Sequence, residues 1–348
     1  MEKLDFRGSY CANEVTESSK FEILSTIRYD SELNRQIDLD RLVEGERVFD
    51  KVDNNPVKSI FFEEDKGKLL EDEENFNLRI EDSAVNIDLL HVFRRRFAYL
   101  SDHYRRMKLS FDYFKWNFEY SQWDILTQLI KSLPTKDNTN DVNSIMEELL
   151  NERNCYKMRV LFLKNGELRI EAHSIPSPPS NWIRGQYFEN VMLKGFLPLS
   201  EAKWNIFIDS EPLEVSPFTY FKTTNRNHYT SARNRMTKFA KTVDNSRSNE
   251  ILLYNNQYQL LEGSITNVAV IKKDEYNNTI YITPKLEVGC LCGVMRNYLL
   301  KNGLITEGTI DIRSLQDGDD ILIFNAIMGC VKGTVRIISI NHTKYEIN

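Results

Sequence analysis

The sequence predicts an α+β fold in two domains, a smaller N-terminal one with helices and strands and a larger, sheet-rich C-terminal one. Apolar residues recur at helical spacing between residues 87 and 151, whereas short runs rich in β-branched and aromatic residues predominate after residue 200. With 348 residues the chain is too long for one small core. We therefore expect an N-terminal domain at residues 1–172, a linker region at 173–195 and a C-terminal domain at 196–348.

The N-terminal domain is expected to begin with a strand at residues 21–29 and to continue mainly in helices. The stretch at residues 31–85 is acidic and irregular, which indicates a surface insertion. After it, helical spacing of apolar residues predicts one or two helices at 87–114 and two more at 123–133 and 142–151.

A β-hairpin is predicted next, because the strand-like residues 158–163 and 167–171 flank Asn165-Gly166, a strong turn signal. In the C-terminal domain, residues 217–221 have the character of a strand that leads up to a lysine. The other predicted strands are 204–210, 251–254, 258–261, 267–272, 279–283 and 320–325.

The composition argues against a nucleic-acid-binding or membrane protein. The formal net charge is −6, whereas general nucleic-acid binding needs a basic face. No apolar run approaches the roughly 20 residues of a membrane span, and the polar N-terminus lacks the apolar centre of a signal peptide. The five cysteines are scattered, and Cys290-Leu291-Cys292 has no second pair to complete a metal site. We therefore expect a cytoplasmic protein without a bound metal.

Lys222 and Glu262 are the most informative residues of the sheet-rich half. A lysine at a strand end beside a cleft loses hydration, which lowers its pKa and makes its amine a nucleophile. A carboxylate between an apolar leucine pair and a Gly-Ser turn is stable as an anion opposite a cation such as a protonated pyridine. Together these groups suit pyridoxal phosphate (PLP). Taken singly, each is more commonly a surface lysine or a glutamate at a strand end.

Weaker signals indicate where a phosphate group would bind. Gly293-Val294-Met295-Arg296 is a glycine turn that runs into a helix, and free N–H groups at a helix N-terminus bind phosphate. The run Arg94-Arg95-Arg96 either supplies a cation for the same phosphate or forms a solvated helix face. Residues 324–329 end a strand in small and polar residues, as a site wall or a simple strand exit would.

The order of these motifs resembles that of the fold-type IV PLP enzymes, which share the fold of the D-amino acid aminotransferases. Within that class the chain is most similar to the aminodeoxychorismate lyases in their longer fungal form, over roughly residues 85–335. The series is Lys222-x-x-Asn225-Arg226, Glu262-Gly263-Ser264-x-Thr266-Asn267-Val268, Thr283-Pro284, Gly293-Val294-Met295-Arg296 and Asn325-Ala326-Ile327-Met328.

The resemblance implies a role for each matching position. Lys222 would bind the cofactor aldehyde covalently and later transfer a proton, and Glu262 would bond the pyridine nitrogen. The phosphate would be held by the backbone N–H groups of Val294 and Met295 and by Arg96. Further implied residues are Thr266 and Asn267 beneath the cofactor, Asn325 and Ala326 beside the phosphate or the substrate, and Arg159 and Arg28 for the substrate carboxylates.

The implied activity is a PLP-dependent lyase that converts 4-amino-4-deoxychorismate to 4-aminobenzoate and pyruvate for folate synthesis. Transaminases of this fold often carry a tyrosine five residues after the lysine, where this chain has Asn227, which favours the lyase. An aminotransferase acting on branched-chain or D-amino acids, or a non-catalytic relative, are the alternatives. The family also implies a homodimer, although insertions near residues 31–85, 135–150 and 173–195 can cover or replace its interface.

Overall fold

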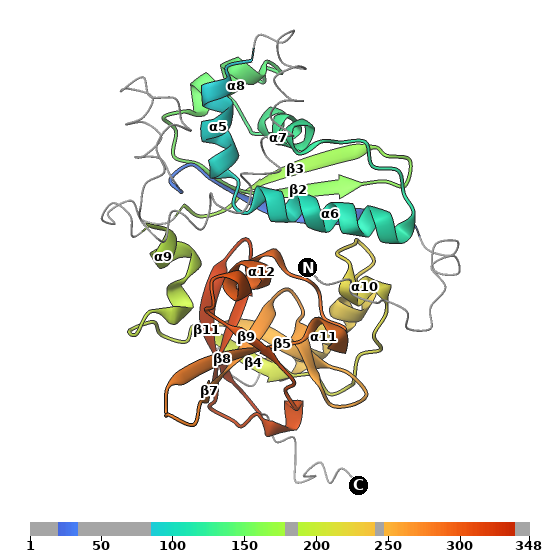
Figure 1. Ribbon diagram of the computed structural model, residues 1–348, viewed down its shortest axis with the longest axis vertical. Coiled ribbons are helices and arrows are strands. Elements are labelled where there is room, and N and C mark those ends of the chain that lie inside the picture. The colour runs from blue at the N-terminus through green and yellow to red at the C-terminus, as the bar shows by residue number, and fades with distance from the viewer. Residues whose placement is uncertain (1–19, 34–84, 178–186, 241–246, 338–348) are drawn as a thin grey trace.

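The computed structural model describes residues 20–33, 85–177, 187–240 and 247–337 (Figure 1). Within these residues, the N-terminal half of the chain forms a three-stranded sheet with helices. The C-terminal half forms an eight-stranded sheet. The acidic insertion expected at residues 31–85 lies outside the described residues except at its two ends. No helix within the described ranges is long and apolar enough to cross a membrane.

Three strands form the N-terminal sheet: β1 (Ile23–Asp30), β2 (Cys155–Phe162) and β3 (Leu168–Ser174). They pair antiparallel in the order β1-β2-β3, so that β1 lies at one edge. The predicted hairpin between β2 and β3 is confirmed, and Gly166 in its turn has a left-handed φ of +85°, which glycine adopts without strain.

Four helices pack with this sheet around the N-terminal core: α5 (Ile87–Arg96), α6 (Leu100–Phe114), α7 (Gln122–Lys131) and α8 (Val142–Leu149). Side-chain oxygens of Asn86, Ser121 and Asp141 cap the first N–H groups of α5, α7 and α8. The segment predicted as one or two helices is two, because the extended backbone of Phe97 ends α5 and Tyr99 starts α6.

Eight strands form the C-terminal sheet, in the order β6-β5-β4-β11-β10-β7-β8-β9. They are β4 (Trp204–Ile208), β5 (Ser248–Tyr254), β6 (Leu260–Gly263), β7 (Asn267–Lys273), β8 (Thr279–Pro284), β9 (Thr306–Gly308), β10 (Asp320–Asn325) and β11 (Gly329–Val335). The sheet is mixed, since β4 runs parallel to β5 and β11, and β8 parallel to β9. Six strands match predicted ones, whereas the very short β9 and the glycine-containing β11 give weak sequence signals.

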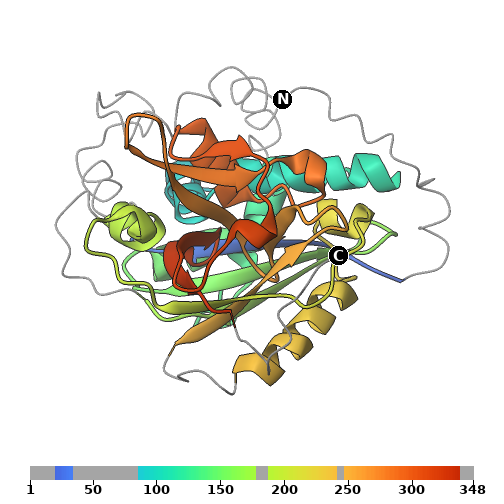
Figure 2. The same ribbon diagram turned by 90° about the horizontal axis from the view of Figure 1, so that it is seen from below.

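The helices of this half are α9 (Tyr187–Met192), α10 (Pro217–Tyr220), α11 (Asn227–Ala240) and α12 (Val294–Lys301). Figure 2 shows α11 at the outer side of the sheet, where Tyr229 and Ala232 share an apolar cluster with Ile251. The predicted helix after Gly293 is confirmed as α12. Short 3-10 turns occur at Lys194–Phe196, Leu286–Val288 and Ile312–Ser314.

The strand predicted at residues 217–221 is wrong, because this segment forms the one-turn helix α10. The Ser216 hydroxyl accepts a hydrogen bond from Phe218 N at 3.3 Å and so caps the helix. Pro217 occupies the first helical position, where a missing N–H sacrifices no helical hydrogen bond. These two signals outweigh the strand propensity of the aromatic residues.

After α10 the chain is extended and joins the edge of β1. Leu24 N donates to the Lys222 carbonyl at 2.9 Å, and Thr224 N donates to the Glu22 carbonyl at 2.9 Å. Lys222 is therefore held at the junction between the N-terminal sheet and the C-terminal half.

The region expected to be a linker, residues 173–195, is described in part. Its first two residues end β3, and its α9 packs against β11 of the C-terminal sheet. Residues 178–186 lie outside the described residues.

Candidate active site

A pocket of about 430 Å³ lies between the two halves of the chain, within the roughly 300–1,000 Å³ of small-molecule sites. The N-terminal half lines it with residues of β1, β2 and α6. The C-terminal half lines it with Lys222, the loop between β6 and β7, the start of α12 and the turn after β10. The pocket therefore joins segments that are far apart in the sequence.

Lys222 lines this pocket from the junction of the two halves. Burial lowers the pKa of its amine well below the usual value, and the nearby charges of Arg106 and Arg226 lower it further. Glu262 opposes this shift only in part. A lysine in this setting gives up its proton more readily than a solvated lysine, so its amine can act as a nucleophile or as a base.

Glu262 lies on β6, lines the same pocket and is only 3% exposed. The Tyr229 hydroxyl donates to its Oε1 at 2.5 Å, and Asn267 Nδ2 donates to its Oε2 at 3.2 Å. Burial raises the pKa of this carboxyl to about 7, although the bond from Tyr229 and the charge of Arg226 act in the opposite direction. A cation placed against Glu262 would therefore complete its ionisation.

A second buried carboxylate, Glu250 on β5, shapes the loop between β6 and β7. Its oxygens accept hydrogen bonds from the N–H groups of Ile251, Ser264 and Ile265 and from the hydroxyls of Ser264 and Thr266. Thr266, predicted to contact the cofactor, lines the pocket but donates its hydroxyl to Glu250 at 2.9 Å. Glu250 therefore fixes the backbone that follows Glu262.

Helix α12 begins at the pocket, where Gly293, Val294 and Met295 form part of the wall. Because its N-cap residue is Gly293, no side chain caps the first N–H groups of the helix. A Cβ on Gly293 would clash with Asn267 Oδ1, so the glycine also leaves Asn267 free to reach Glu262. The predicted positions Val294 and Met295 therefore lie at a helix N-terminus suited to an anionic group.

The structure separates Arg96, the predicted phosphate arginine, from the pocket. Arg96 is fully buried at the end of α5, where its guanidinium donates to the Leu149 and Leu150 carbonyls at 3.1 and 2.8 Å. Among helices α5 to α8, the arginine that lines the pocket is Arg106 of α6. It donates to Ser25 Oγ at 3.1 Å. The break between α5 and α6 explains the difference, because it turns Arg96 toward the N-terminal core.

The two arginines predicted to bind substrate carboxylates do not line the pocket either. Arg159 donates to Glu171 at 2.9 Å, although it is close enough to Lys222 to lower the pKa of that amine. Lys157, two residues earlier on the same face of β2, lines the pocket instead. Arg28 is buried and donates to the Ile327 carbonyl, behind the pocket wall.

Asn325 and Ala326, which were predicted to lie beside the phosphate or the substrate, both line the pocket at the end of β10 and in the turn after it. Asn325 Oδ1 accepts from Ile327 N and Met328 N, each at 2.9 Å. Its Nδ2 donates to the Ile265 carbonyl at 3.2 Å. Asn325 therefore shapes this turn and ties it to the loop after Glu262.

Sequence reasoning missed several residues that the structure places in the pocket or beside it. Weak signals for some were present: His103 and Arg106 are three apart on one helix face, and Lys157 shares a strand face with Arg159. Tyr229 had no such signal, because its helix α11 was not predicted. The missed residues are His103, Arg106, Lys157, Tyr229 and Glu250.

Comparison with known proteins relates these residues to a family. The model of the class IV aminotransferases matches residues 87–334, which is well over half of the chain. This chain belongs to the class IV aminotransferase family. As a class IV protein it has the α+β fold of that family, whose members typically use PLP.

Several proteins similar to this class IV chain are known. The aminodeoxychorismate lyase of Saccharomyces cerevisiae is 37% identical over 366 residues, 94% of this chain and 96% of the relative. A relative from Schizosaccharomyces pombe is 35% identical over 144 residues, 40% of this chain and 58% of its own. The structure of the branched-chain amino acid aminotransferase of Escherichia coli has a TM-score of 0.45 at 14% identity, covering 69% of this chain and 70% of that chain.

Proposed function

We propose that this class IV protein is a PLP-dependent aminodeoxychorismate lyase, which converts 4-amino-4-deoxychorismate to 4-aminobenzoate and pyruvate for folate synthesis. The observation that carries the proposal is its similarity to the yeast lyase along nearly the whole of both chains. The pocket supports it, since one cavity contains an amine and a carboxyl with shifted pKa values. The two products together contain every atom of the substrate, so the reaction consumes no second substrate.

The pocket residues fit three polar groups of PLP: the aldehyde, the pyridine nitrogen and the phosphate. Lys222 presents an amine of lowered pKa for the aldehyde. Glu262 is buried, and it accepts hydrogen bonds from uncharged groups such as the hydroxyl of Tyr229 and the amide of Asn267, so its carboxyl suits a protonated pyridine nitrogen. The uncapped start of α12 and the guanidinium of Arg106, which line the same pocket, suit the phosphate.

The protein residues then have distinct tasks. When bound, PLP supplies an aldehyde that captures the ring amine of the substrate and a ring that withdraws electrons from the carbon bearing that amine. Glu262 keeps the ring nitrogen protonated. The N–H groups of Val294 and Met295 and the guanidinium of Arg106 hold the phosphate and so fix the orientation of the reacting carbon toward Lys222.

Lys222 carries the proton transfer. Its lowered pKa favours the neutral form of the amine, and this amine removes the proton from the substrate carbon that bears the nitrogen. The bond between the ring and the enolpyruvyl oxygen then breaks, and its electron pair leaves with that oxygen. Lys222 returns the proton to the departing fragment, which becomes pyruvate. Because the ring becomes aromatic, the elimination is strongly favourable and the protein mainly supplies positioning and proton transfer.

The substrate carries two carboxylates, and the pocket offers cations from both halves of the chain. Lys157 lines it from β2, and Arg226 lines it from the segment after Lys222. Arg226 is held over the Tyr229 ring, 4.2 Å from its centroid, and donates to the Ser264 carbonyl at 2.9 Å. We assign one substrate carboxylate to Lys157, with Arg159 next to it on the same strand face.

The homodimer and the cytoplasmic location expected from the sequence remain predictions. Size-exclusion chromatography with light scattering checks the homodimer.

The deciding experiment mixes PLP-loaded protein with 4-amino-4-deoxychorismate and follows 4-aminobenzoate and pyruvate separately. Wild-type protein should release both in equal amounts. Lys222→Ala should lower the rate at least about 10³-fold, since it removes both the nucleophile and the base. Lys285→Ala, which changes an exposed lysine outside the pocket, is the matched control and should retain wild-type turnover.

Each alternative gives a different result. A PLP-loaded wild type that forms neither product would refute the lyase, and formation of a keto acid from an added amino acid would then identify an aminotransferase. A protein that takes up no PLP would be the non-catalytic relative.

A further inference from the structure

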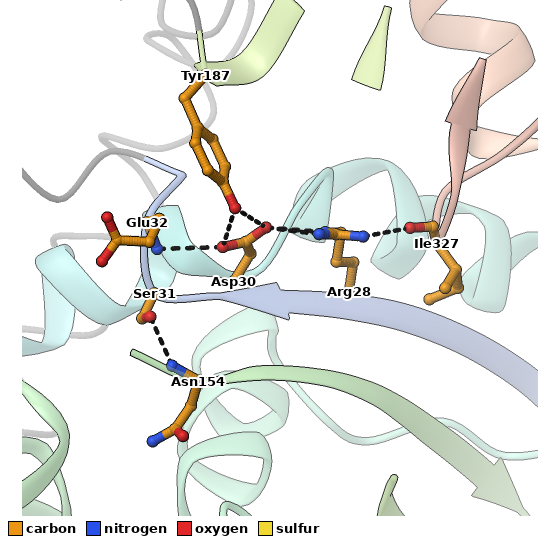
Figure 3. A network of polar contacts seen from close by, with 7 residues as sticks. All are labelled: Arg28, Asp30, Ser31, Glu32, Asn154, Tyr187 and Ile327. Atoms are coloured by element: carbon orange, nitrogen blue, oxygen red, sulfur yellow. Dashed lines mark hydrogen bonds and ion pairs between the residues drawn. The ribbon is translucent and has the colours of Figure 1, made fainter. Parts of the chain in front are cut away.

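A buried polar network joins β1 to the turn after β10 (Figure 3). Residues of this turn line the pocket. Arg28 and Asp30 share one face of β1, and their side chains are only 6% and 2% exposed. Arg28 donates to Asp30 Oδ2 through Nε at 3.0 Å and through Nη2 at 2.8 Å. Its Nη1 donates to the Ile327 carbonyl at 2.6 Å, a contact between residues 299 positions apart.

The residue that Arg28 contacts is fixed from both sides. The carbonyl of Ile327 accepts from Arg28, and its N–H donates to Asn325 Oδ1 at 2.9 Å. Ile327 lines the pocket together with its neighbours Ala326 and Met328. Loss of the Arg28 contact would therefore release the Ile327 carbonyl and leave this part of the wall held by the bonds from Ile327 N and Met328 N to Asn325.

Helix α9 contacts β1 at one end and the start of β11 at the other. Its Tyr187 hydroxyl donates to Asp30 Oδ1 and Oδ2 at 3.1 and 3.0 Å (Figure 3). Its other end packs against the residue that directly follows the turn, because a Cβ on Gly329, the first residue of β11, would lie 2.6 Å from Met192 Cα. Strand β1 therefore contacts both the turn and α9, and α9 packs beside the end of the turn, which lines the pocket.

The geometry also shows what Arg28 does not do. All three guanidinium nitrogens donate to Asp30 or Ile327, and the side chain is buried, so Arg28 is not placed to receive a substrate carboxylate. A buried ion pair adds little net stability, because desolvation offsets its attraction. What the pair secures is the orientation of the one donor that reaches Ile327.

We propose that Arg28 is a positioning residue that holds the Ala326–Met328 wall of the pocket through the Ile327 carbonyl, and that this wall sets how tightly substrate binds. Asp30 and Tyr187 fix the guanidinium in place. The part that concerns substrate rests on the proposed lyase activity, whereas the position of the wall is measured without it. This role replaces the carboxylate contact expected for Arg28 from the sequence.

The test compares Arg28→Lys, Asp30→Asn and Tyr187→Phe in the full, PLP-loaded protein. Arg28→Lys keeps the charge, but an ammonium lacks the planar fork that reaches Asp30 and Ile327 together. We expect amide hydrogen exchange at residues 325–328 to quicken about tenfold and the KM for 4-amino-4-deoxychorismate to rise about tenfold, with kcat within about twofold. Asp30→Asn should act in the same direction, and Tyr187→Phe more weakly.

The matched control is Arg169→Lys, which changes an exposed arginine of the same sheet that pairs with Glu22. It should alter neither the exchange nor the KM, and all variants should keep the wild-type dissociation constant for PLP. A raised KM with unchanged exchange at 325–328 would mean that Arg28 binds substrate directly and would overturn the proposal. Faster exchange with an unchanged KM would overturn the link between the wall and substrate binding. If the wild type fails to turn over substrate, the lyase assignment fails, while the exchange comparison still decides the positioning role.

Discussion

Lys222 and Glu262 line one pocket and must meet opposite requirements. A lysine that attacks an aldehyde needs a neutral amine, and burial supplies this by lowering its pKa. A carboxylate that holds a pyridinium must be ionised, yet burial raises the pKa of Glu262 to about 7. The same low polarity therefore prepares the amine and leaves the carboxyl dependent on a cation, so full ionisation of Glu262 should accompany cofactor binding.

The raised pKa of Glu262 predicts a specific pH dependence of stability in the cofactor-free protein. The unfolded carboxyl titrates near 4.5 and the folded one near 7, so the folded state binds more protons between these values. The stability contributed by protonated Glu262 is complete below about pH 4.5 and is lost as pH rises to about 7. Relative to Glu262→Gln, the wild type should lose up to about 3 kcal/mol of unfolding free energy over this range.

Urea unfolding at pH 5, 6, 7 and 8 checks this prediction, with Glu147→Gln on the exposed face of α8 as the control. A difference between wild type and Glu262→Gln that stays constant across these pH values would contradict it.

At the scale of elements, the break between α5 and α6 decides which arginine reaches the pocket. Apolar periodicity predicted helix across residues 87–114 but did not locate the break, because Phe97 and Tyr99 fit an apolar helix face as well as a turn. Tertiary packing selects the turn, and Arg96 then donates to the carbonyls of Leu149 and Leu150 at the end of α8. The sequence motif placed an arginine on this segment correctly, but only the packing identifies Arg106.

Because of this break, substitution of Arg106 by lysine should affect PLP binding, whereas substitution of Arg96 by lysine should affect stability. Arg106→Lys should weaken PLP binding about tenfold or more, because an ammonium cannot hold a phosphate in the bidentate manner of a guanidinium. Arg96→Lys should leave PLP affinity near wild type but lower the unfolding free energy by about 2 kcal/mol, since it strands buried carbonyls of Leu149 and Leu150. Titration of each variant with PLP, alongside urea unfolding, separates the two effects, and weak PLP binding by Arg96→Lys would refute this placement.

Local signals were dependable where the chain itself supplies the geometry. Gly293 is the N-cap of α12, as its motif predicts, and a glycine is needed there because Asn267 lies too close for a Cβ. Lys222 and Glu262 also line the pocket, but their flanking residues alone do not distinguish them, and the order of the motifs along the chain was needed to select them. By contrast, the aromatic residues of α10 favour a strand, but the cap at Ser216 decides for a helix.

At the scale of the whole molecule, the pocket depends on contacts that no local pattern reveals. The edge of β1 receives the segment of Lys222, and Arg28 on that strand reaches Ile327 near the other end of the chain. Much of the C-terminal wall could therefore be predicted from motifs, whereas Tyr229 of that wall and the N-terminal wall, with Lys157 and Arg106, required the fold. The position of a residue in the sequence tells which neighbours lie on the same face of a strand, but not which distant element packs against that face.

Because both halves line the pocket, a molecule bound there should stabilise the whole protein in one cooperative transition. PLP at about a hundred times its Kd adds about 2.7 kcal/mol, which for a chain of this length raises the unfolding midpoint by about 4 °C. Pyridoxal, which lacks the phosphate, should raise it less at the same concentration, since it forgoes the contacts with Arg106 and the start of α12. Calorimetry of the cofactor-free protein with each compound measures both shifts. Two separate transitions, of which PLP moves only one, would show that one half holds the cofactor alone and that the other half contributes to the substrate only.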